Sequence, residues 1–254
     1  MMIVIFDGAT NQKGIAMQLD NATVLVTGAN RGLGLEFARQ ALARGARKVY
    51  AGARDPASVT LAGVTPVRLD VTDPGSVAAA ARELGDVGLV INNAGIAHFQ
   101  QVLADGVEDA LRAMLETNVF GILGMSRAFA PVLGRNGGGA ILNVLSVASW
   151  ISSPALAAYG VSKSAAWGLT NALRNELRGQ GTQVLALHVG FIDTDLTRDI
   201  ALPKLAPATV VDRGFAALEA GADEVMIDEL TQTVKAGLSR VPGIYTEEVR
   251  RNNA

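Results

Sequence analysis

The stretch 23-TVLVTGANRGLG-34 joins a run of β-branched and apolar residues to a turn that contains three glycines. The run predicts a strand that is buried on both faces. From residue 32 to residue 44 apolar side chains recur at helical spacing, which predicts a helix directly after the turn. Such a turn lets the backbone approach a pyrophosphate at the helix N-terminus, although glycine turns that bind nothing also join strands to helices. The glycines are Gly28, Gly32 and Gly34.

The order of strand and then helix repeats along the chain. Strands that are apolar almost throughout need cover on both faces, and the crossovers between parallel strands are right-handed, so the series predicts a doubly wound parallel α/β sheet. The predicted strands are 23–27, 48–52, 64–70, 88–92, 140–145, 182–188 and 224–227. The predicted helices are 32–44, 74–84, 107–134, 157–178, 212–220 and 228–239. We therefore expect a sheet of about seven strands, with the glycine turn at its start, where a phosphate site is favoured.

A single domain is expected over residues 21–254, with a short substrate lobe near 195–211. Residues 1–20 are interpreted as an extension before the fold, because they have a short apolar run but neither a positively charged leader nor a small-residue cleavage site. No later segment reaches the roughly 18 uninterrupted apolar residues that a membrane helix needs. The domain is therefore not expected to contact a membrane.

The composition favours a cytoplasmic protein that acts on small molecules. The 254 residues carry a formal net charge of −2, which offers no broad basic surface for nucleic acid. Cysteine is absent, which excludes disulfides, thiolate metal sites and cysteine nucleophiles and is compatible with a reducing compartment. The two histidines, His98 and His188, lie far apart in the sequence, so no metal site is expected.

The stretch 156-LAAYGVSKSAAWGL-169 sets a tyrosine and a lysine four residues apart on one helix face. The ammonium of Lys163 near the hydroxyl of Tyr159 would favour the phenolate and lower the pKa of the tyrosine toward the working pH. Such a tyrosine is usable as a general acid or base. The alternative is a tyrosine packed by its ring and a lysine that reaches water. Ser146, at the end of a predicted strand, favours the chemical interpretation.

Together these motifs resemble the short-chain dehydrogenase/reductase family from about residue 23 to residue 197. Further motifs that carry the resemblance are Asp70-Val71, the NNAG sequence at 92–95, and Asn118. The resemblance implies a Rossmann-type fold and an oxidoreductase that uses a nicotinamide dinucleotide. It implies that Tyr159 protonates the developing alkoxide while Ser146 orients the same oxygen.

The resemblance also assigns roles to Lys163 and Asn118. Lys163 is expected to hold the nicotinamide ribose and to lower the pKa of the tyrosine. Asn118 is expected to anchor a water in a proton relay to this lysine, although a buried structural asparagine is the alternative. The expected cofactor-binding residues are Gly28, Asn30, Arg31, Gly32, Leu33, Gly34, Arg54, Asp70, Val71, Asn93, Ala94, Gly95, Tyr159, Lys163, Gly190, Ile192 and Thr194.

Two arginines favour NADP(H) over NAD(H). The 2′ position of the cofactor is read at the end of the second strand, where Arg54 stands. A guanidinium pairs with the 2′-phosphate of NADP, whereas a carboxylate would accept the 2′-hydroxyl of NAD. Arg31 in the glycine turn is expected to reach the same phosphate. Asp55 beside Arg54 weakens the distinction, and two solvated surface arginines are the alternative.

Several features depart from the family pattern. Val189 stands where the family usually has proline, and the C-terminus lacks the frequent glycine-rich ending. The short substrate lobe indicates an open cleft that accepts many carbonyls or a bulky substrate. Residues 230, 234 and 238 form an apolar stripe that is expected to be core rather than a partner surface. The cleft lining is expected to include His98, Ala148, Trp150 and Leu196.

The function expected from these features is an NADPH-dependent carbonyl reductase that runs in reverse as an alcohol dehydrogenase. A 3-oxoacyl-thioester reductase is an alternative, but no prominent basic patch for an acyl carrier is evident. A non-catalytic NADP-binding redox sensor is the second alternative, against which the intact tyrosine, lysine and serine count. The two long helices, 107–134 and 157–178, are expected to pair two copies into a homodimer, and a homotetramer is the alternative. Substrate identity and stereochemistry depend on pocket shape.

Overall fold

A computed structural model describes residues 16–246 of the chain, and they form one sheet with helices on both faces. The sheet has seven strands in the order β3-β2-β1-β4-β5-β6-β7, and every neighbouring pair is parallel. The strands are β1 (Thr23–Thr27), β2 (Lys48–Ala53), β3 (Thr65–Arg68), β4 (Leu89–Asn92), β5 (Ala140–Val144), β6 (Gln183–His188) and β7 (Glu224–Met226). The predicted doubly wound, single-domain fold is confirmed. The strand order reverses between β1 and β4, and a crevice forms at such a switch point, beyond the carboxyl ends of the strands.

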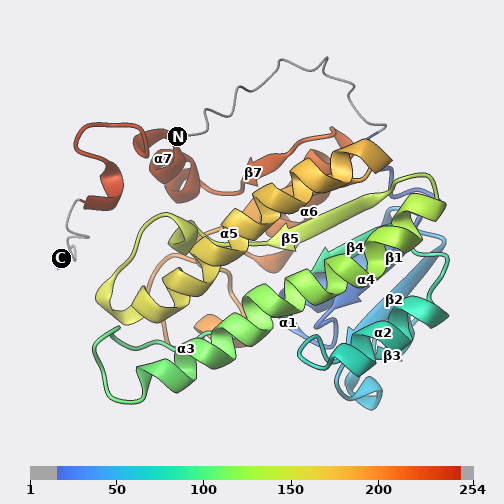
Figure 1. Ribbon diagram of the computed structural model, residues 1–254, viewed down its shortest axis with the longest axis horizontal. Coiled ribbons are helices and arrows are strands. Elements are labelled where there is room, and N and C mark those ends of the chain that lie inside the picture. Colours follow the sequence, from blue (N-terminus) through green and yellow to red (C-terminus); the bar gives the residue numbers. More distant parts are fainter. Residues whose placement is uncertain (1–15, 247–254) are drawn as a thin grey trace, which may run out of the picture.

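The helices form two layers around the sheet (Figure 1). α1 packs beside α6 on one face, whereas α2, α4 and α5 cover the other. The helices are α1 (Gly32–Ala43), α2 (Pro74–Glu83), α3 (Val107–Leu115), α4 (Gly121–Arg135), α5 (Ala157–Leu177), α6 (Pro207–Glu219) and α7 (Glu229–Gly237).

Each face of the sheet has its own apolar core. Under α1 and α6, Phe37 and Phe215 meet edge to face with ring centroids 5.4 Å apart. On the opposite face, Phe129 and Leu133 of α4 pack in a cluster that includes Ile141 of β5. Successive strand residues point to opposite faces, so each central strand contributes to both cores. This explains why the strands are apolar almost throughout.

Two helices differ from the sequence-based expectation. α6 begins at Pro207 and not at residue 212, because the fixed φ of proline and its missing N–H suit the first helical position. The predicted helix 107–134 is divided by a π-helical turn at Glu116–Phe120. Turns of this kind re-aim side chains and are frequent at functional sites.

Only part of the apolar stripe predicted on the last helix, α7, is buried in the core. Val234 is buried, and Leu238 packs against the same cluster with Ile244. Leu230 is 45% exposed, so the prediction that it belongs to the core is wrong. It lies in the first turn of α7, with its side chain beside Gly190.

Part of the predicted N-terminal extension lies outside the described residues, which begin at 16. Within the remainder, Leu19 is fully buried in the α1 and α6 core. The Met17 amide donates to the side chain of Gln183, and the Leu19 amide donates to Glu219. Residues 17–19 therefore pack on the domain.

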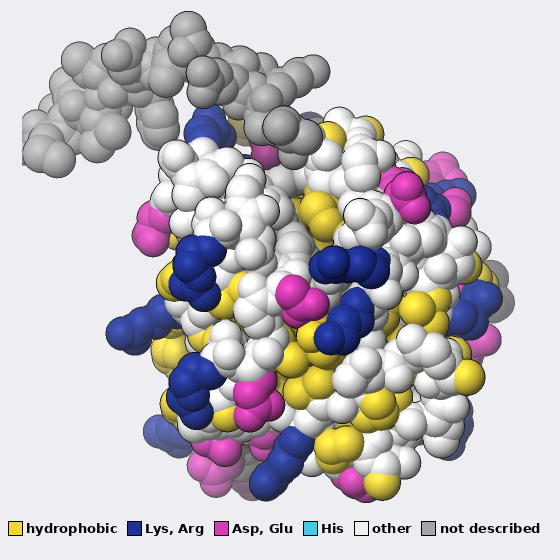
Figure 2. Space-filling model, turned by 90° about the vertical axis from the view of Figure 1, so that its right-hand side faces the viewer, with side chains coloured by type: hydrophobic (Ala, Val, Ile, Leu, Met, Phe, Trp, Pro, Cys, Tyr) yellow, Lys and Arg dark blue, Asp and Glu magenta, His cyan; other side chains and the backbone are white. Residues whose placement is uncertain are grey.

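The described surface carries mixed charges. On the face in Figure 2, acidic and basic side chains are interspersed among apolar ones, with no large patch of one sign. Across residues 16–246, no helix is both long and apolar enough to span a bilayer. The same residues contain no cluster of His, Asp and Glu suited to a metal ion.

Candidate active site

A cleft of about 980 Å³ opens at the carboxyl ends of the strands. Two of the predicted site residues do not line it, namely Gly34 and Asn118. The predicted residues that do line it are Gly28, Asn30, Arg31, Gly32, Leu33, Arg54, Asp70, Val71, Asn93, Ala94, Gly95, Ser146, Tyr159, Lys163, Gly190, Ile192 and Thr194. Segments that are far apart in the sequence therefore meet in one crevice.

The glycine turn presents an uncapped helix end to this cleft. α1 has no side-chain hydrogen bond at its N-cap, Arg31, and no acidic residue in its first turn. Gly28 and Gly32 have φ values of 65° and 55°, which side chains rarely allow. Free N–H groups at a helix N-terminus attract an anion. The turn therefore fits the pyrophosphate of a dinucleotide.

Gly34 lies outside the cleft lining and allows a close backbone contact that supports the glycine turn. A Cβ at this position would lie 2.1 Å from the carbonyl oxygen of Gly28 and 2.5 Å from Asn93 Nδ2. Asn93 Nδ2 in turn donates to the carbonyl oxygens of Thr27 and Gly28, at 2.9 Å and 3.3 Å. The absent side chain thus lets the glycine turn and the turn after β4 pack together, which keeps the backbone of both available to a ligand.

Ser146 and Lys163 are fixed by hydrogen bonds at the end of β5. The hydroxyl of Ser146 accepts from the amide of Ala148 at 3.1 Å. Nζ of Lys163 donates to the carbonyl oxygen of Val144 at 2.9 Å and lies 5.7 Å from the centre of the Tyr159 ring. Tyr159 and Lys163 lie one turn apart in α5, and both line the cleft beside Ser146. This arrangement can transfer a proton to or from an oxygen atom held in the cleft.

Burial sets the proton affinities of the pair. Burial raises the pKa of Tyr159 to about 12, and its interaction with the Ser146 hydroxyl opposes the rise. Burial also lowers the pKa of Lys163 to about 8. We expected the ammonium to lower the pKa of the tyrosine, and the structure gives the opposite direction because desolvation of the phenolate outweighs other effects. At neutral pH, Tyr159 therefore carries a proton that it can donate.

Asn118 lies in the π-helical turn and is buried. Its Nδ2 donates to the carbonyl oxygen of Ile96 at 2.9 Å and to the hydroxyl of Ser162 at 3.0 Å. Its Oδ1 accepts from the amide of Ile96 at 2.9 Å. Both N–H groups of the amide are thus used, and these bonds fix the backbone beside Gly95 at the cleft wall. The structure does not bring Asn118 itself into the cleft lining.

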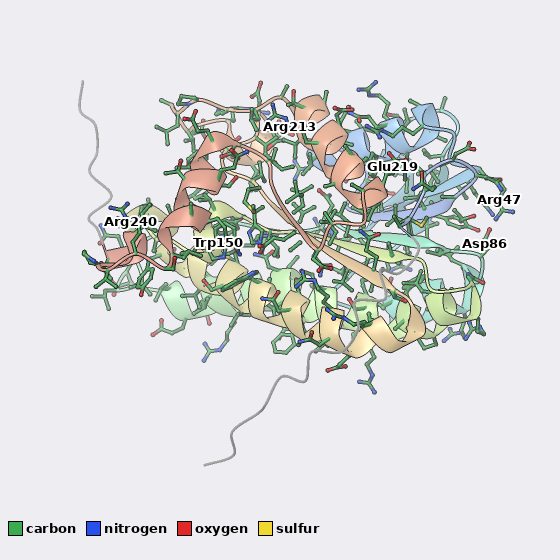
Figure 3. The ribbon with its side chains drawn as sticks, turned by 90° about the horizontal axis from the view of Figure 1, so that it is seen from above. Arg47, Asp86, Trp150, Arg213, Glu219 and Arg240 are labelled. Atoms are coloured by element: carbon green, nitrogen blue, oxygen red, sulfur yellow. The ribbon has the colours of Figure 1, made fainter. Side chains whose placement is uncertain are left out.

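Trp150 lies behind the site, so the prediction that it lines the cleft is wrong. It is buried beneath α7, on the side toward α5 (Figure 3), and stacks on His188 with ring centroids 3.9 Å apart. Nδ1 of His188 lies 3.2 Å from the carbonyl oxygen of Ser146, and Nε2 lies 3.2 Å from a carboxylate oxygen of Glu224. His98, also expected in the lining, is exposed outside the cleft.

Acidification is expected to weaken the fold through Glu224. Burial alone would raise the pKa of this carboxyl, but hydrogen bonds from His188 and Lys235 lower it to about 2 from its ordinary 4.5. A lowered folded-state pKa gives stability that is present above about pH 4.5 and is lost as the pH falls toward 2. After solvent screening we expect Glu224 to contribute about 1–2 kcal/mol.

The measurement is the free energy of unfolding by urea at pH 6 and at pH 3. Glu224→Gln should lose less stability between the two pH values than the unmodified protein loses. Asp109→Asn is the control, because that carboxylate is almost fully exposed. If the Glu224→Gln variant and the unmodified protein lose the same free energy of unfolding between pH 6 and pH 3, Glu224 is not the source of the acid sensitivity.

Other lining residues were not predicted individually. Most of them follow a strand directly or adjoin a predicted motif. Their position in the chain is therefore the sequence feature from which their place in the cleft could have been predicted. Phe99 lies farther along the loop after β4, where the sequence pattern gives no direction for a side chain. The additional lining residues are Ala53, Asp55, Ser58, Leu69, Thr72, Ile96, Ala97, Phe99, Thr117, Val144, Leu145, Val147, Leu156, Val189, Phe191, Asp195, Thr197 and Ile200.

The fold and the site define a Rossmann-type α/β protein with a glycine turn that fits the pyrophosphate of a dinucleotide. The family model for short chain dehydrogenases matches residues 22–204. The chain belongs to the short-chain dehydrogenase/reductase family.

Several relatives and solved structures are similar to the chain. A short chain dehydrogenase from Burkholderia cenocepacia in complex with NADP is 43% identical, with a TM-score of 0.85 over 88% of this chain and 94% of that one. The galactitol 2-dehydrogenase (L-tagatose-forming) of Cereibacter sphaeroides is 38% identical over 71% of this chain and 75% of its own length. The dehydrogenase/reductase SDR family member 7B of Mus musculus is 35% identical over 70% of this chain. The chain spans 60% of the length of that mouse protein.

Proposed function

We propose that the protein is an NADP-dependent oxidoreductase that interconverts a carbonyl compound and a secondary alcohol. The observation that carries the proposal is the meeting of Ser146, Tyr159 and Lys163 in the same cleft as the uncapped glycine turn. A nicotinamide dinucleotide, when bound there, would supply or accept the hydride. The residues in this cleft fit it, because its phosphate groups need the free N–H groups of the turn.

The side chains supply proton transfer and positioning. In the reduction direction the protonated hydroxyl of Tyr159 donates its proton to the carbonyl oxygen as negative charge develops there. The Ser146 hydroxyl is oriented by the hydrogen bond that it accepts from the Ala148 amide. It donates a hydrogen bond to the same substrate oxygen. Lys163, fixed at the carbonyl of Val144, holds positive charge near the phenolate that forms. Asn118 contributes by fixing the backbone on which this wall of the cleft depends.

NADP is the proposed cofactor because two exposed arginines line the adenosine end of the cleft. Arg31 follows the first glycine of the turn and Arg54 follows β2 directly. Guanidinium groups at this place pair with a 2′-phosphate. The similar Burkholderia cenocepacia structure, which is a complex with NADP, supports the same preference. Asp70 and Val71 are proposed to border the adenine.

Replacing Arg54 with aspartate is expected to reverse the cofactor preference. The new carboxylate would repel a 2′-phosphate and accept a hydrogen bond from a 2′-hydroxyl, so the ratio of kcat/KM with NADPH to that with NADH should fall by about 100-fold. Steady-state kinetics with both cofactors measure this ratio. Arg68→Asp, at the end of the edge strand β3 and outside the cleft lining, is the control. An unchanged ratio in the Arg54 variant would remove this residue from cofactor selection.

A panel of ketones, aldehydes and 3-oxoacyl thioesters, assayed by the absorbance of NADPH and NADH, tests the proposed activity. Turnover of simple carbonyl compounds supports it. The acyl thioesters are included because the 3-oxoacyl-acyl-carrier-protein reductase of Salmonella typhimurium is 29% identical over 73% of this chain. Higher efficiency on the thioesters would favour the thioester reductase, and NADPH binding without any turnover would favour a redox sensor.

We also propose a homodimer that pairs through α4 and α5. Three large apolar side chains on this surface are exposed, namely Phe120 beside α4, Leu123 in α4 and Val161 in α5. Covering them would remove apolar surface from water. Sedimentation equilibrium should give twice the monomer mass, and Phe120→Asp combined with Val161→Asp should shift the protein toward the monomer. A monomeric unmodified protein would contradict the proposal.

A further inference from the structure

The charged side chains of the cleft gather at its cofactor end. Arg31 belongs to the glycine turn, Arg54 and Asp55 follow β2, and Asp70 follows β3. Asp195 reaches the same end, because its carboxylate lies 3.5 Å from the guanidinium of Arg31. Apart from Lys163 at the catalytic centre, the charged lining residues in the described chain thus belong to the region proposed to hold the dinucleotide.

The wall beyond the catalytic tyrosine is apolar. Ile96 packs in the same cluster as the Tyr159 ring, and Ala148 follows Ser146 by two residues. Leu156 is the N-cap residue of α5, less than one turn before the tyrosine. These residues line the cleft where a substrate carbonyl would meet the hydroxyl of Tyr159.

The segment after β6, which leads into the substrate lobe, adds apolar side chains to the cleft, and the cations of the lobe lie outside the lining. Phe191 and Leu196 line the cleft. Arg198 pairs with Asp195, and Lys204 donates to the carbonyl oxygen of Arg198. Both cations therefore have their partners within the lobe. In the described chain neither cation lines the cleft, so beyond the dinucleotide region Lys163 is the one positive charge near a carboxylate or phosphate on the substrate.

Two large side chains of the lining are half exposed. Phe99 is 45% exposed and Leu196 is 47% exposed. They come from the loops after β4 and after β6. A ligand that covered both would remove apolar surface from water, and this gain grows with the apolar area of the ligand.

We propose that the substrate is an apolar ketone or its secondary alcohol, with no further hydroxyl or carboxylate near the reacting carbon. The inference rests on the proposed function, since it names the substrate class of the same cleft. A polyol would have to lose water from each hydroxyl against a wall of side chains that offers no partner. Several unpaired hydroxyls together should cost at least about 100-fold in kcat/KM.

The test compares hexan-2-ol with galactitol, because both are open-chain secondary alcohols with six carbons. With NADP⁺ as the oxidant, we expect kcat/KM for hexan-2-ol to be at least 100-fold higher. Leu156→Asn should reduce this ratio about tenfold by placing an amide in the wall. This variant is expected to fold, because asparagine is well suited to an N-cap position. Leu202→Asn, at an exposed leucine outside the cleft, should leave the ratio unchanged.

Equal or higher efficiency on galactitol overturns the inference while the proposed function stands. If neither alcohol is oxidised, saturation-transfer NMR on the protein with NADP⁺ still shows which of the two alcohols binds. A signal for hexan-2-ol that is weakened in Leu156→Asn, with none for galactitol, supports the apolar wall even if the proposed activity fails. A signal for galactitol alone, or for both alcohols equally, overturns it.

Discussion

Tyr159→Phe is expected to lower turnover by about 10³-fold or more while the protein still binds NADP. The substitution removes one hydroxyl, which is the group proposed to give its proton to the substrate oxygen, and general acid catalysis contributes about 10²–10⁴-fold. The phenylalanine ring keeps the packing of the tyrosine against the cluster of Val107, Met114 and Ala158. The measurements are kcat at saturating substrate and the NADP dissociation constant by calorimetry.

The structure offers a matched control for this substitution. Tyr245 is 59% exposed and lies outside the cleft lining, so Tyr245→Phe removes the same atom from a place where no reaction is proposed. It should leave both kcat and NADP affinity unchanged. Near-normal turnover in the Tyr159→Phe variant, with a similar melting temperature, would exclude Tyr159 as the proton donor.

The sequence predicted the parts of this protein that depend on local patterns. Strand positions follow from short apolar runs, and the parallel order follows from their alternation with helices. The glycine turn was visible because Gly28 and Gly32 need a backbone conformation that few other residues adopt. The helical spacing of Tyr159 and Lys163 placed both on one face of α5, where the structure has them.

Features that depend on distant contacts could not be predicted in this way. Trp150 follows Ser146 by four residues, which suggested a place in the cleft. Its ring instead turns toward α7, whose residues come more than 75 positions later in the chain. The direction of the Tyr159 pKa cannot be predicted for a related reason: spacing indicates a nearby cation, but only the packed structure shows that burial of the side chain raises the pKa.

Lys163→Met is expected to lower turnover by about 10²–10³-fold and to weaken NADP binding. Methionine has a similar length and no charge, so it fills the space of the lysine side chain but cannot donate to the carbonyl oxygen of Val144. It also removes the cation that lies 5.7 Å from the Tyr159 ring. The measurements are kcat, the KM for NADPH and the pH dependence of alcohol oxidation. Lys48→Met is the control, because that lysine lies in β2 at the opposite end of the strand from the cleft and is not part of the cleft lining.

The pH dependence separates an electrostatic role of Lys163 from a structural one. Alcohol oxidation needs Tyr159 as a phenolate, and a neighbouring cation stabilises that form. Lys163 has a pKa of about 8, so its charge is present at neutral pH and is lost as the pH rises through 8. Without the cation the tyrosine pKa is higher, so the rise of the oxidation rate should move to higher pH and the deficit of the variant should shrink above pH 8. A deficit that stays constant from pH 6 to pH 10 would show that the lysine acts only by holding the wall of the cleft, and the proposed charge effect on Tyr159 would be wrong.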